Sequence, residues 1–139
     1  MNFKKIQYED IEIILNWEKL NFANTENYNI EQLKNIFGND TYQIIGAYNK
    51  KKICGYIIIH IGDKIDVEKI FVELSSRKQG IGTMLVQYII ENFPNKKIIL
   101  EVNKENSTAI SFYKTLGFSL LNTRKDYYGA NKDALILEK

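Results

Sequence analysis

The spacing of apolar residues changes from strand-like to helix-like near the start of the chain. Residues 3–7 predict a short strand. After Asp10, a residue suited to an N-cap, apolar residues recur every three or four positions and predict a helix. Residues 21–29 are polar and predict a loop, and residues 30–37 predict a second helix that Gly38 ends.

Three strand-like segments follow, at residues 41–48, 52–61 and 64–72. Asn-Lys-Lys joins the first two and predicts a tight hairpin, and a Gly-Asp-Lys turn separates the second from the third. Helical spacing then returns over residues 80–93, and Pro94 ends this helix.

The last part of the chain alternates between the two patterns once more. Residues 96–102 predict an apolar strand, and residues 107–116 predict a helix that stops at Gly117. Residues 118–128 and 133–138 predict two strands around a Gly-Ala-Asn-Lys turn. The predicted order of elements is therefore β-α-α-β-β-β-α-β-α-β-β.

This order predicts an α/β fold with a mixed central β-sheet. Neighbours joined by hairpins should be antiparallel, and the strands on either side of the central helix should be parallel. The chain has no internal repeat, flexible linker or low-complexity tract. We therefore expect a single domain over residues 1–139.

Composition narrows the classes of function. The 139 residues are 45% hydrophobic and carry a formal net charge of +2, which argues against nucleic acid as a partner. No signal-peptide pattern is present, and the longest apolar run is too short to span a bilayer. The lone Cys54 excludes an internal disulfide and a cysteine-based metal cluster. We expect a cytoplasmic protein with no metal and no membrane association.

Residues 77–82 carry the first chemical motif, Arg-Lys-Gln-Gly-Ile-Gly, at the start of a predicted helix. A helix N-terminus presents about four unpaired N–H groups, and glycines let an anion approach them closely. The glycines are too closely spaced for a P-loop, and Leu85 stands where a dinucleotide fingerprint needs a small residue. The pattern [RQ]-x-x-G-x-[GA] remains and suits a pyrophosphate group. A glycine-rich helix entrance without a ligand is the alternative.

A second motif, Glu-Val-Asn-Lys-Glu-Asn-Ser-Thr-Ala-Ile-Ser-Phe-Tyr-Lys-Thr-Leu-Gly-Phe, occupies residues 101–118. Together the two motifs resemble those of the GNAT-family N-acetyltransferases, most closely the bacterial ribosomal-protein-alanine N-acetyltransferases. The resemblance implies the GNAT (acyl-CoA N-acyltransferase) fold and acetyl-CoA as cosubstrate. It also implies that a primary amine attacks acetyl-CoA directly in a ternary complex.

Two residues of the second motif suit this reaction on chemical grounds. Asn106 and Tyr113 are seven residues apart, two turns on one helix face, so both side chains can reach one groove. The thiolate that leaves acetyl-CoA has a pKa near ~8.5, and tyrosine, with an ordinary pKa near ~10, can hydrogen-bond or protonate it. The alternative is that Tyr113 is an ordinary aromatic residue at the edge of the core.

Glu101 interrupts the apolar strand 96–102, where a charged residue needs a reason. By resemblance, it matches the general base that takes a proton from the acceptor. A protein α-amine has a pKa near ~8, so a single carboxylate, acting directly or through water, can deprotonate it. The alternative is an outward-facing glutamate paired with a lysine. We predict Glu101 and Tyr113 as the catalytic residues.

The resemblance also implies which residues bind acetyl-CoA. The strand before the glycine turn should lend backbone groups to the pantetheine arm, where the fourth and fifth strands splay apart. A backbone N–H near Val72 should face the oxyanion, and the amides of the glycine turn should contact the phosphates. The predicted cofactor-binding residues are Ile70, Phe71, Val72, Arg77, Lys78, Gln79, Gly80, Ile81, Gly82, Thr83 and Asn106.

The C-terminal part of the chain bears on the acceptor. Tyr127 and Tyr128 resemble a tyrosine pair that lines the acceptor groove in the ribosomal-protein group, with the loop 21–29 opposite, although they would also suit ordinary strand positions. A protein N-terminal α-amine is therefore the favoured acceptor. A small-molecule amine, such as a polyamine, an amino acid or an aminoglycoside, is the alternative, and a non-catalytic acyl-CoA-binding module is a further one. Both a monomer and a homodimer are compatible with the sequence.

Overall fold

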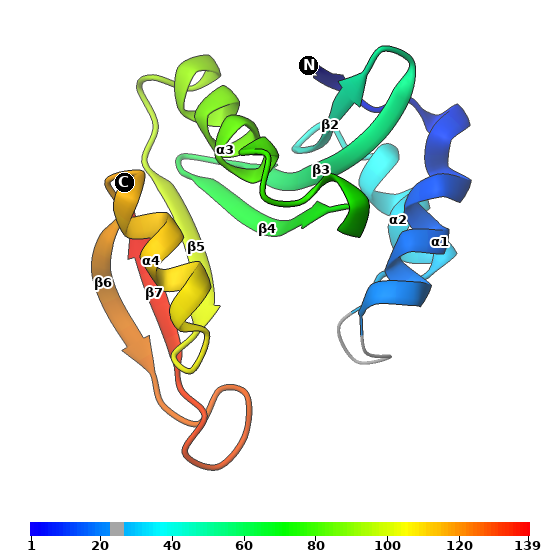
Figure 1. Ribbon diagram of the computed structural model, residues 1–139. Coiled ribbons are helices and arrows are strands. Elements are labelled where there is room, and N and C mark those ends of the chain that lie inside the picture. Colours follow the sequence, from blue (N-terminus) through cyan, green and yellow to red (C-terminus); the bar gives the residue numbers. More distant parts are fainter. Residues whose placement is uncertain (23–26) are drawn as a thin grey trace.

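The computed structural model of the protein describes residues 1–22 and 27–139, and its strands form one seven-stranded sheet (Figure 1). The strands are β1 (Asn2–Lys5), β2 (Tyr42–Asn49), β3 (Lys52–Ile61), β4 (Ile65–Val72), β5 (Ile98–Asn103), β6 (Ser119–Arg124) and β7 (Ala134–Glu138). The helices are α1 (Ile11–Asn21), α2 (Ile30–Phe37), α3 (Ile81–Asn92) and α4 (Ser107–Thr115). This is the order that the sequence predicts, so the predicted α/β fold is confirmed.

The sheet is mixed, with the strand order β1-β2-β3-β4-β5-β7-β6. Strands β1 to β4 pair with one another in antiparallel fashion. Strand β4 pairs with β5 in parallel, because α3 carries the chain back across the sheet between them. Strand β7 lies between β5 and β6 and is antiparallel to both.

Helices cover both faces of the sheet. On one face, Ile14 of α1 and Leu33 of α2 share a buried cluster with Tyr56 of β3. On the other face, Leu85 of α3 packs with Ile57, the next residue of the same strand. Adjacent residues of a strand point to opposite faces, so the middle of β3, residues 53–59, lacks charged residues because it is buried on both sides. Full burial of a side chain such as Leu85 contributes about 1.5–3 kcal/mol.

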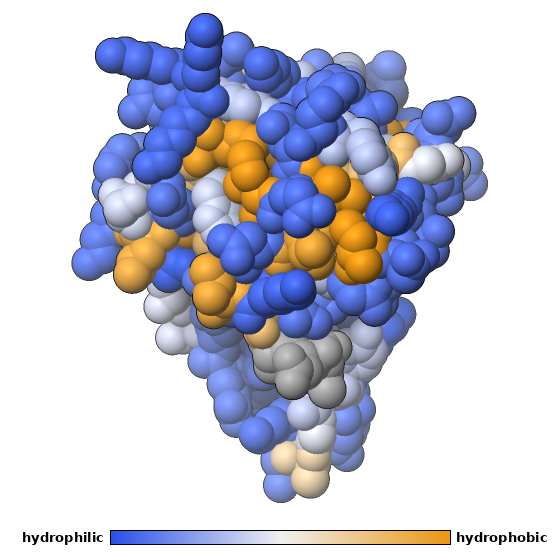
Figure 2. All heavy atoms as spheres, turned by 90° about the vertical axis from the view of Figure 1, so that its right-hand side faces the viewer, coloured by the Kyte–Doolittle hydropathy of each residue, from blue (hydrophilic) through white to orange (hydrophobic). Residues whose placement is uncertain are grey.

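The outer surface of α1 and α2 is partly apolar. Figure 2 looks onto this side of the molecule, where apolar side chains lie in patches among polar ones. Ile13 and Leu20 of α1 are 41% and 72% exposed. Scattered exposed apolar side chains are ordinary on a folded protein, so this surface is not by itself evidence of a binding site.

The parallel pair β4–β5 holds together over a short stretch. Residues 65–67 of β4 pair with residues 98–100 of β5, and the part of the chain that the structure describes shows no pairing between them beyond this stretch. Both strands continue, to Val72 and Asn103, and Figure 1 shows them diverging. The splay between the fourth and fifth strands is therefore present, as the resemblance implied.

A β-bulge in β4 lies where the two strands part. Ile58 and Ile59 are adjacent on β3, yet their partners on β4 are Lys69 and Val67, so Glu68 is an extra residue. Residues two apart on a strand ordinarily share a face. The bulge breaks this rule: Val67 packs on the α3 side of the sheet, whereas Lys69 reaches α1 on the other side.

Strand β6 is shorter than predicted. It ends at Arg124, so the tyrosine pair at 127–128 lies in the connection to β7 and the prediction of a strand over 118–128 is wrong at its end. Asp126 has a φ of +55°, and its carboxylate accepts a hydrogen bond from the Asn131 N–H at 2.7 Å. The backbone therefore turns before it reaches the tyrosines.

The two N-terminal helices begin in different ways. Asp10 stands at the start of α1, but its side chain caps nothing there. Helix α2 has a capping box instead, in which Asn29 and Gln32 each accept the other's backbone N–H at 2.9 Å. Helix α1 extends to Asn21, the first residue of the predicted loop, and residues 23–26 of that loop lie outside the described residues. No described helix is long and apolar enough to cross a membrane.

Candidate active site

A cleft of about 670 Å³ opens where β4 and β5 part. The cleft is lined by both strands, by α4, by the flanks of the α1–α2 connection and by the β6–β7 connection. The lining residues are Phe22, Tyr28, Asp66, Val67, Glu68, Lys69, Ile70, Ile99, Leu100, Glu101, Val102, Asn103, Asn106, Ala109, Tyr113, Tyr127 and Tyr128. The cleft therefore brings together the predicted catalytic pair, both predicted acceptor tyrosines, Ile70 and Asn106.

A second hollow, of about 620 Å³, lies near β1, α1 and the turn between β2 and β3. Its lining includes the run of lysines at 50–52 together with Trp17 and Tyr48, but none of the predicted site residues. The chemistry that the two motifs carry therefore belongs to the cleft between β4 and β5.

The end of β4 turns backbone groups toward the splay. Glu73 N–H donates to the Cys54 carbonyl at 2.8 Å, and Gly55 stands opposite Val72. In antiparallel pairing this makes Val72 and Gly55 a non-hydrogen-bonded pair, so the backbone groups of Val72 point away from β3. In agreement, Arg77 Nε donates to the Val72 carbonyl at 2.8 Å. The Val72 N–H faces the side from which β5 has diverged.

The glycine turn leads from β4 into α3. Lys78 and Gly80 have φ values of +64° and +79°, so the chain twice enters the left-handed region before the helix. Any residue with a side chain would be strained at Gly80. A Cβ at Gly82 would instead lie 3.6 Å from Phe112, an ordinary contact, so neither backbone strain nor crowding within the protein requires a glycine there.

The side chains of several predicted cofactor-binding residues are buried or bonded within the protein. Ile81 is 2% exposed and Phe71 is 6% exposed, and the two belong to the buried clusters on opposite faces of the sheet. Arg77 is turned back onto the carbonyl of Val72. The turn 77–83 lies past the end of β4, outside the lining of the cleft. Contacts from Phe71 and Ile81 to a cofactor are thus limited to their backbone groups.

Tyr113 lies on α4 and is 7% exposed, with its ring packed between Phe112 and Phe118 at centroid distances of 5.0 and 5.7 Å. Burial raises the pKa of Tyr113 to about 12. The hydroxyl therefore keeps its proton throughout the working range of pH and can donate it. Tyr113 both packs against aromatic residues of the core and lines the cleft. The predicted catalytic role and the alternative of an aromatic residue at the edge of the core are therefore compatible.

Asn106 lies at the start of α4 and caps it. Its side-chain oxygen accepts the Ala109 N–H at 3.1 Å. The oxygen is thus engaged by the helix, and the amide nitrogen is the group that suits a ligand in the cleft. Asn106 and Tyr113 both line the cleft, as their spacing predicts.

Glu101 of β5 lines the cleft and carries an ion pair at the same time. Arg124 Nη1 of β6 lies 3.0 Å from its Oε1, and the Glu101 side chain is 32% exposed. The sequence predicted either a general base in the cleft or an outward-facing glutamate paired with a lysine. In the structure Glu101 lines the cleft and is also ion-paired, with an arginine instead of a lysine as the partner. The arginine orients one carboxylate oxygen and leaves the carboxylate at the cleft surface.

Glu68 is a second carboxylate of the cleft, and the sequence reasoning missed it. It is the extra residue of the bulge in β4. Burial, followed by the charges of Asp66 and Glu101, raises the pKa of Glu68, and His60 partly opposes the shift. A carboxylate with a raised pKa is a stronger base. The available signal was the adjacent pair Glu68-Lys69, which breaks the alternation of a strand.

Two pairs of aromatic residues from separate parts of the chain line the same cleft as these acids. Tyr127 and Tyr128 are 52% and 39% exposed, and their rings meet edge-on with centroids 5.1 Å apart. Phe22 and Tyr28 come from the two described flanks of the α1–α2 connection. The tyrosine pair and the described flanks of the loop 21–29 therefore line the same cleft.

Comparison with known proteins identifies the class to which this fold and cleft belong. Residues 9–118 match the model of the Acetyltransferase (GNAT) family. The match covers most of the chain, so the protein belongs to the GNAT family, as the sequence predicted. It is an acetyl-CoA-dependent N-acetyltransferase with the GNAT fold. Among residues 1–22 and 27–139, no group of three or more acidic, histidine or cysteine side chains could hold a metal ion.

The similar curated proteins include enzymes that modify protein N-termini. The [Ribosomal protein bS18]-alanine N-acetyltransferase of Salmonella typhimurium is 26% identical over 113 residues, which cover 75% of this chain and 76% of that protein. The enzyme of the same name from Escherichia coli is 30% identical over 81 residues, covering 54% of this chain and 55% of that enzyme. That aligned segment spans about half the length of the Escherichia coli relative.

Solved structures show the same fold. The ribosomal-protein-S18-alanine N-acetyltransferase from Escherichia coli has a TM-score of 0.86 and 21% identity, over 99% of this chain and 91% of that one. An aminoglycoside 6'-N-acetyltransferase complexed with coenzyme A has a TM-score of 0.81 and 16% identity, over 100% and 96% of the two chains. Both identities are low, so these likenesses concern the fold and leave the acceptor open.

Proposed function

We propose that the protein acetylates the N-terminal α-amine of a polypeptide, as its ribosomal-protein-alanine relatives do by name. The observation that carries the proposal is the composition of the cleft, which Glu68 and Glu101 line together with two aromatic pairs. Carboxylates suit a primary amine, and aromatic rings in the same cleft suit the first residues of a peptide. The matched relatives named for this activity support the same acceptor.

The cosubstrate site would be built mainly from backbone groups. Acetyl-CoA supplies an acetyl thioester, and the open edge of β4 suits its pantetheine arm. The Val72 N–H, which faces the splay, would donate to the thioester oxygen. The amides from Lys78 to Thr83, at the N-terminus of α3, suit the phosphates.

Side chains in the cleft would serve both the acceptor and the leaving group. Glu101 takes a proton from the acceptor amine, and Glu68 adds a second negative charge that attracts the ammonium form. Tyr113 keeps its proton because its pKa is raised to about 12, and its hydroxyl donates a hydrogen bond to the thiolate that leaves. Asn106 holds the start of α4, and so fixes the helix that presents Tyr113.

A comparison of acceptors tests this proposal. The probes are a hexapeptide with a free N-terminal alanine, the same peptide with a blocked N-terminus and one internal lysine, and spermidine. We expect kcat/KM for the free peptide to exceed that for spermidine by at least about a hundredfold, and no reaction with the blocked peptide. Released thiol gives the rate, and mass spectrometry of the peptide gives the site of acetylation.

A small polyamine is the second candidate acceptor. Among the described residues that line the cleft, Asp66, Glu68 and Glu101 are carboxylates and Lys69 is the one cationic side chain. A cleft with this balance would also concentrate a multiply charged amine. Preference for spermidine in the comparison above would assign this acceptor class and contradict N-terminal acetylation.

A further inference from the structure

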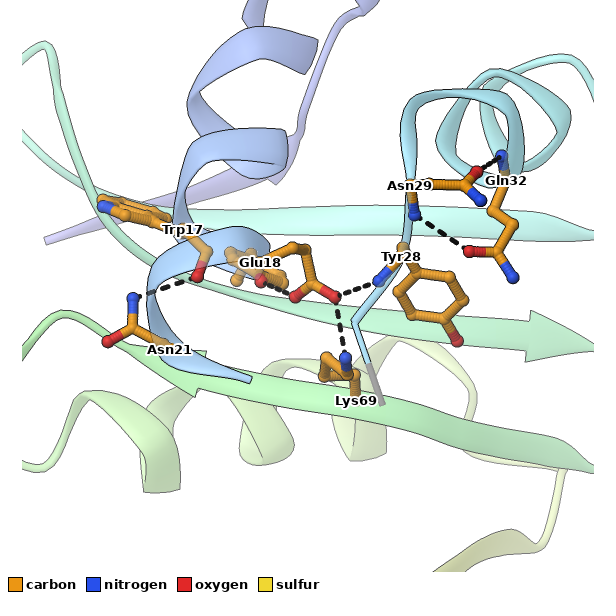
Figure 3. A network of polar contacts seen from close by, with 8 residues as sticks. Trp17, Glu18, Asn21, Tyr28, Asn29, Gln32 and Lys69 are labelled. Atoms are coloured by element: carbon orange, nitrogen blue, oxygen red, sulfur yellow. Dashed lines mark hydrogen bonds and ion pairs between the residues drawn. The ribbon is translucent and has the colours of Figure 1, made fainter. Parts of the chain in front are cut away.

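One acid of α1 is buried behind the cleft. Glu18 is 0% exposed, the one charged side chain that is fully buried among the residues that the structure describes. A buried carboxylate is costly unless hydrogen-bond donors surround it. The Tyr28 N–H at 2.8 Å and Lys69 Nζ at 2.7 Å both donate to Oε1 (Figure 3). The Tyr56 hydroxyl donates to Oε2.

These donors come from elements that are far apart in the sequence. Tyr56 lies on β3, Lys69 on β4 and Tyr28 just before α2. Lys69 points to this side of the sheet because of the bulge at Glu68. Burial and the bond to Glu18 raise the pKa of Tyr56, so its hydroxyl keeps the proton that it donates. A single carboxylate therefore ties α1 to two strands and to the segment that enters α2.

Two of the donors are also part of the cleft surface. Lys69 and Tyr28 line the cleft, and so does Phe22 at the end of α1. Lys69 Nζ lies 3.8 Å from the ring centroid of Phe22 and 4.7 Å from that of Tyr28, which is the geometry of a cation–π contact. Phe22, Tyr28 and Lys69 thus form one continuous surface, which we call the acceptor wall.

Both the charge of Glu18 and its hydrogen bonds matter to the cleft. Lys69 is the residue after Glu68, and its ammonium group would repel a protonated amine if nothing compensated it. The ion pair with Glu18 offsets that charge from behind the acceptor wall. The carboxylates of the cleft are then left to attract the acceptor.

We propose that Glu18 is a positioning residue for acceptor binding, which acts by holding the acceptor wall through Lys69 and Tyr28. The inference rests on the proposed function, because the acceptor wall matters to catalysis when an amine enters the cleft. A purely stabilising role accounts less well for the network, since buried ion pairs can often be replaced by apolar residues without loss of stability. What Glu18 adds is the placement of three residues that line the site.

The test compares two variants with a matched control. Glu18→Gln removes the charge with little change of shape. The apolar variant Glu18→Leu/Tyr56→Phe/Lys69→Met removes the whole network without leaving a buried charge. Ile14→Val is the control, because Ile14 lies one turn earlier on α1, is 0% exposed and does not line the cleft.

Each protein is assayed with acetyl-CoA and the alanine hexapeptide or spermidine. We expect KM for the acceptor to rise about tenfold in both variants, with KM for acetyl-CoA unchanged. The Tm of the apolar variant should equal or exceed that of the wild type. Its Tyr28 amide should exchange with solvent at least about tenfold faster than in the wild type. The control should keep the kinetic constants and the Tyr28 exchange rate of the wild type.

Unchanged acceptor KM in both variants, with Tyr28 exchange as in the wild type, would overturn the proposal. A lower Tm in Glu18→Gln with all kinetic constants unchanged would overturn it too, because it would show a structural role alone. If the wild type acetylated neither probe, the proposed function would be contradicted. Tyr28 exchange in the apolar variant would still decide whether Glu18 holds the acceptor wall.

Discussion

Replacing Tyr113 with phenylalanine is expected to lower kcat by about a hundredfold while leaving the affinity for coenzyme A unchanged. The change removes one hydroxyl from the cleft and keeps the ring that packs on Phe112 and Phe118. Because the pKa of Tyr113 is raised to about 12, its proton is present at every ordinary assay pH. The variant should therefore be slow over the whole range, with no narrowing of the difference toward alkaline pH.

Tyr88→Phe is the matched control for this experiment. Tyr88 lies on α3, is half-buried and packs on Phe3 at 5.9 Å, outside the cleft. The control should keep the wild-type kcat in a steady-state assay of released thiol. A Tyr113→Phe enzyme that turned over at the wild-type rate would remove this residue from the mechanism.

Replacing Glu101 with glutamine is expected to lower kcat/KM for the acceptor by about a hundredfold near neutral pH. The base is needed where the amine is still an ammonium ion, below its pKa of ~8. The difference between variant and wild type should thus be largest below the pKa of the amine, and should narrow as the pH rises through that value.

Glu68→Gln separates the role of Glu68 in the cleft from that of Glu101. We expect a smaller loss of kcat/KM, about tenfold, because Glu68 attracts the acceptor rather than taking its proton. A larger loss in Glu68→Gln than in Glu101→Gln would assign the base to Glu68. Glu105→Gln is the control for both, since Glu105 is exposed in the turn before α4 and does not line the cleft.

Glu68→Gln also has an expected effect on the stability of the fold. Burial and the charge of Asp66 raise the pKa of Glu68, so the folded protein holds this proton more tightly than the unfolded chain does. The resulting stability is fully present below the unfolded pKa and is lost as pH rises through the folded pKa. At neutral pH, Glu68→Gln should therefore have a free energy of unfolding equal to or above that of the wild type. Chemical denaturation at pH 7 checks this.

Where hydrophobic periodicity was strong, the sequence predicted the fold closely. The predicted helix 30–37 and the predicted strand 52–61 have the bounds of α2 and β3. The strand 118–128 was predicted too long because Asp126 stops it. A positive φ and a side-chain hydrogen bond leave no trace in the alternation of apolar and polar residues.

The candidate site was predicted in part. Glu101 and Tyr113 come from one long motif, and the structure places both in the cleft. Glu68 was not predicted because its position depends on a β-bulge, which no sequence motif indicates. Glu18 could not be found from sequence, since its donors are 10, 38 and 51 residues away and an acid on an amphipathic helix ordinarily faces solvent.

The change in Tm that coenzyme A causes is the most direct test of the central claim, that the splay between β4 and β5 and the glycine turn bind acetyl-CoA. A ligand that binds the folded state raises Tm through mass action. We predict a rise of several degrees at a concentration of about a hundred times Kd. No change in Tm at millimolar coenzyme A would contradict the account of the site.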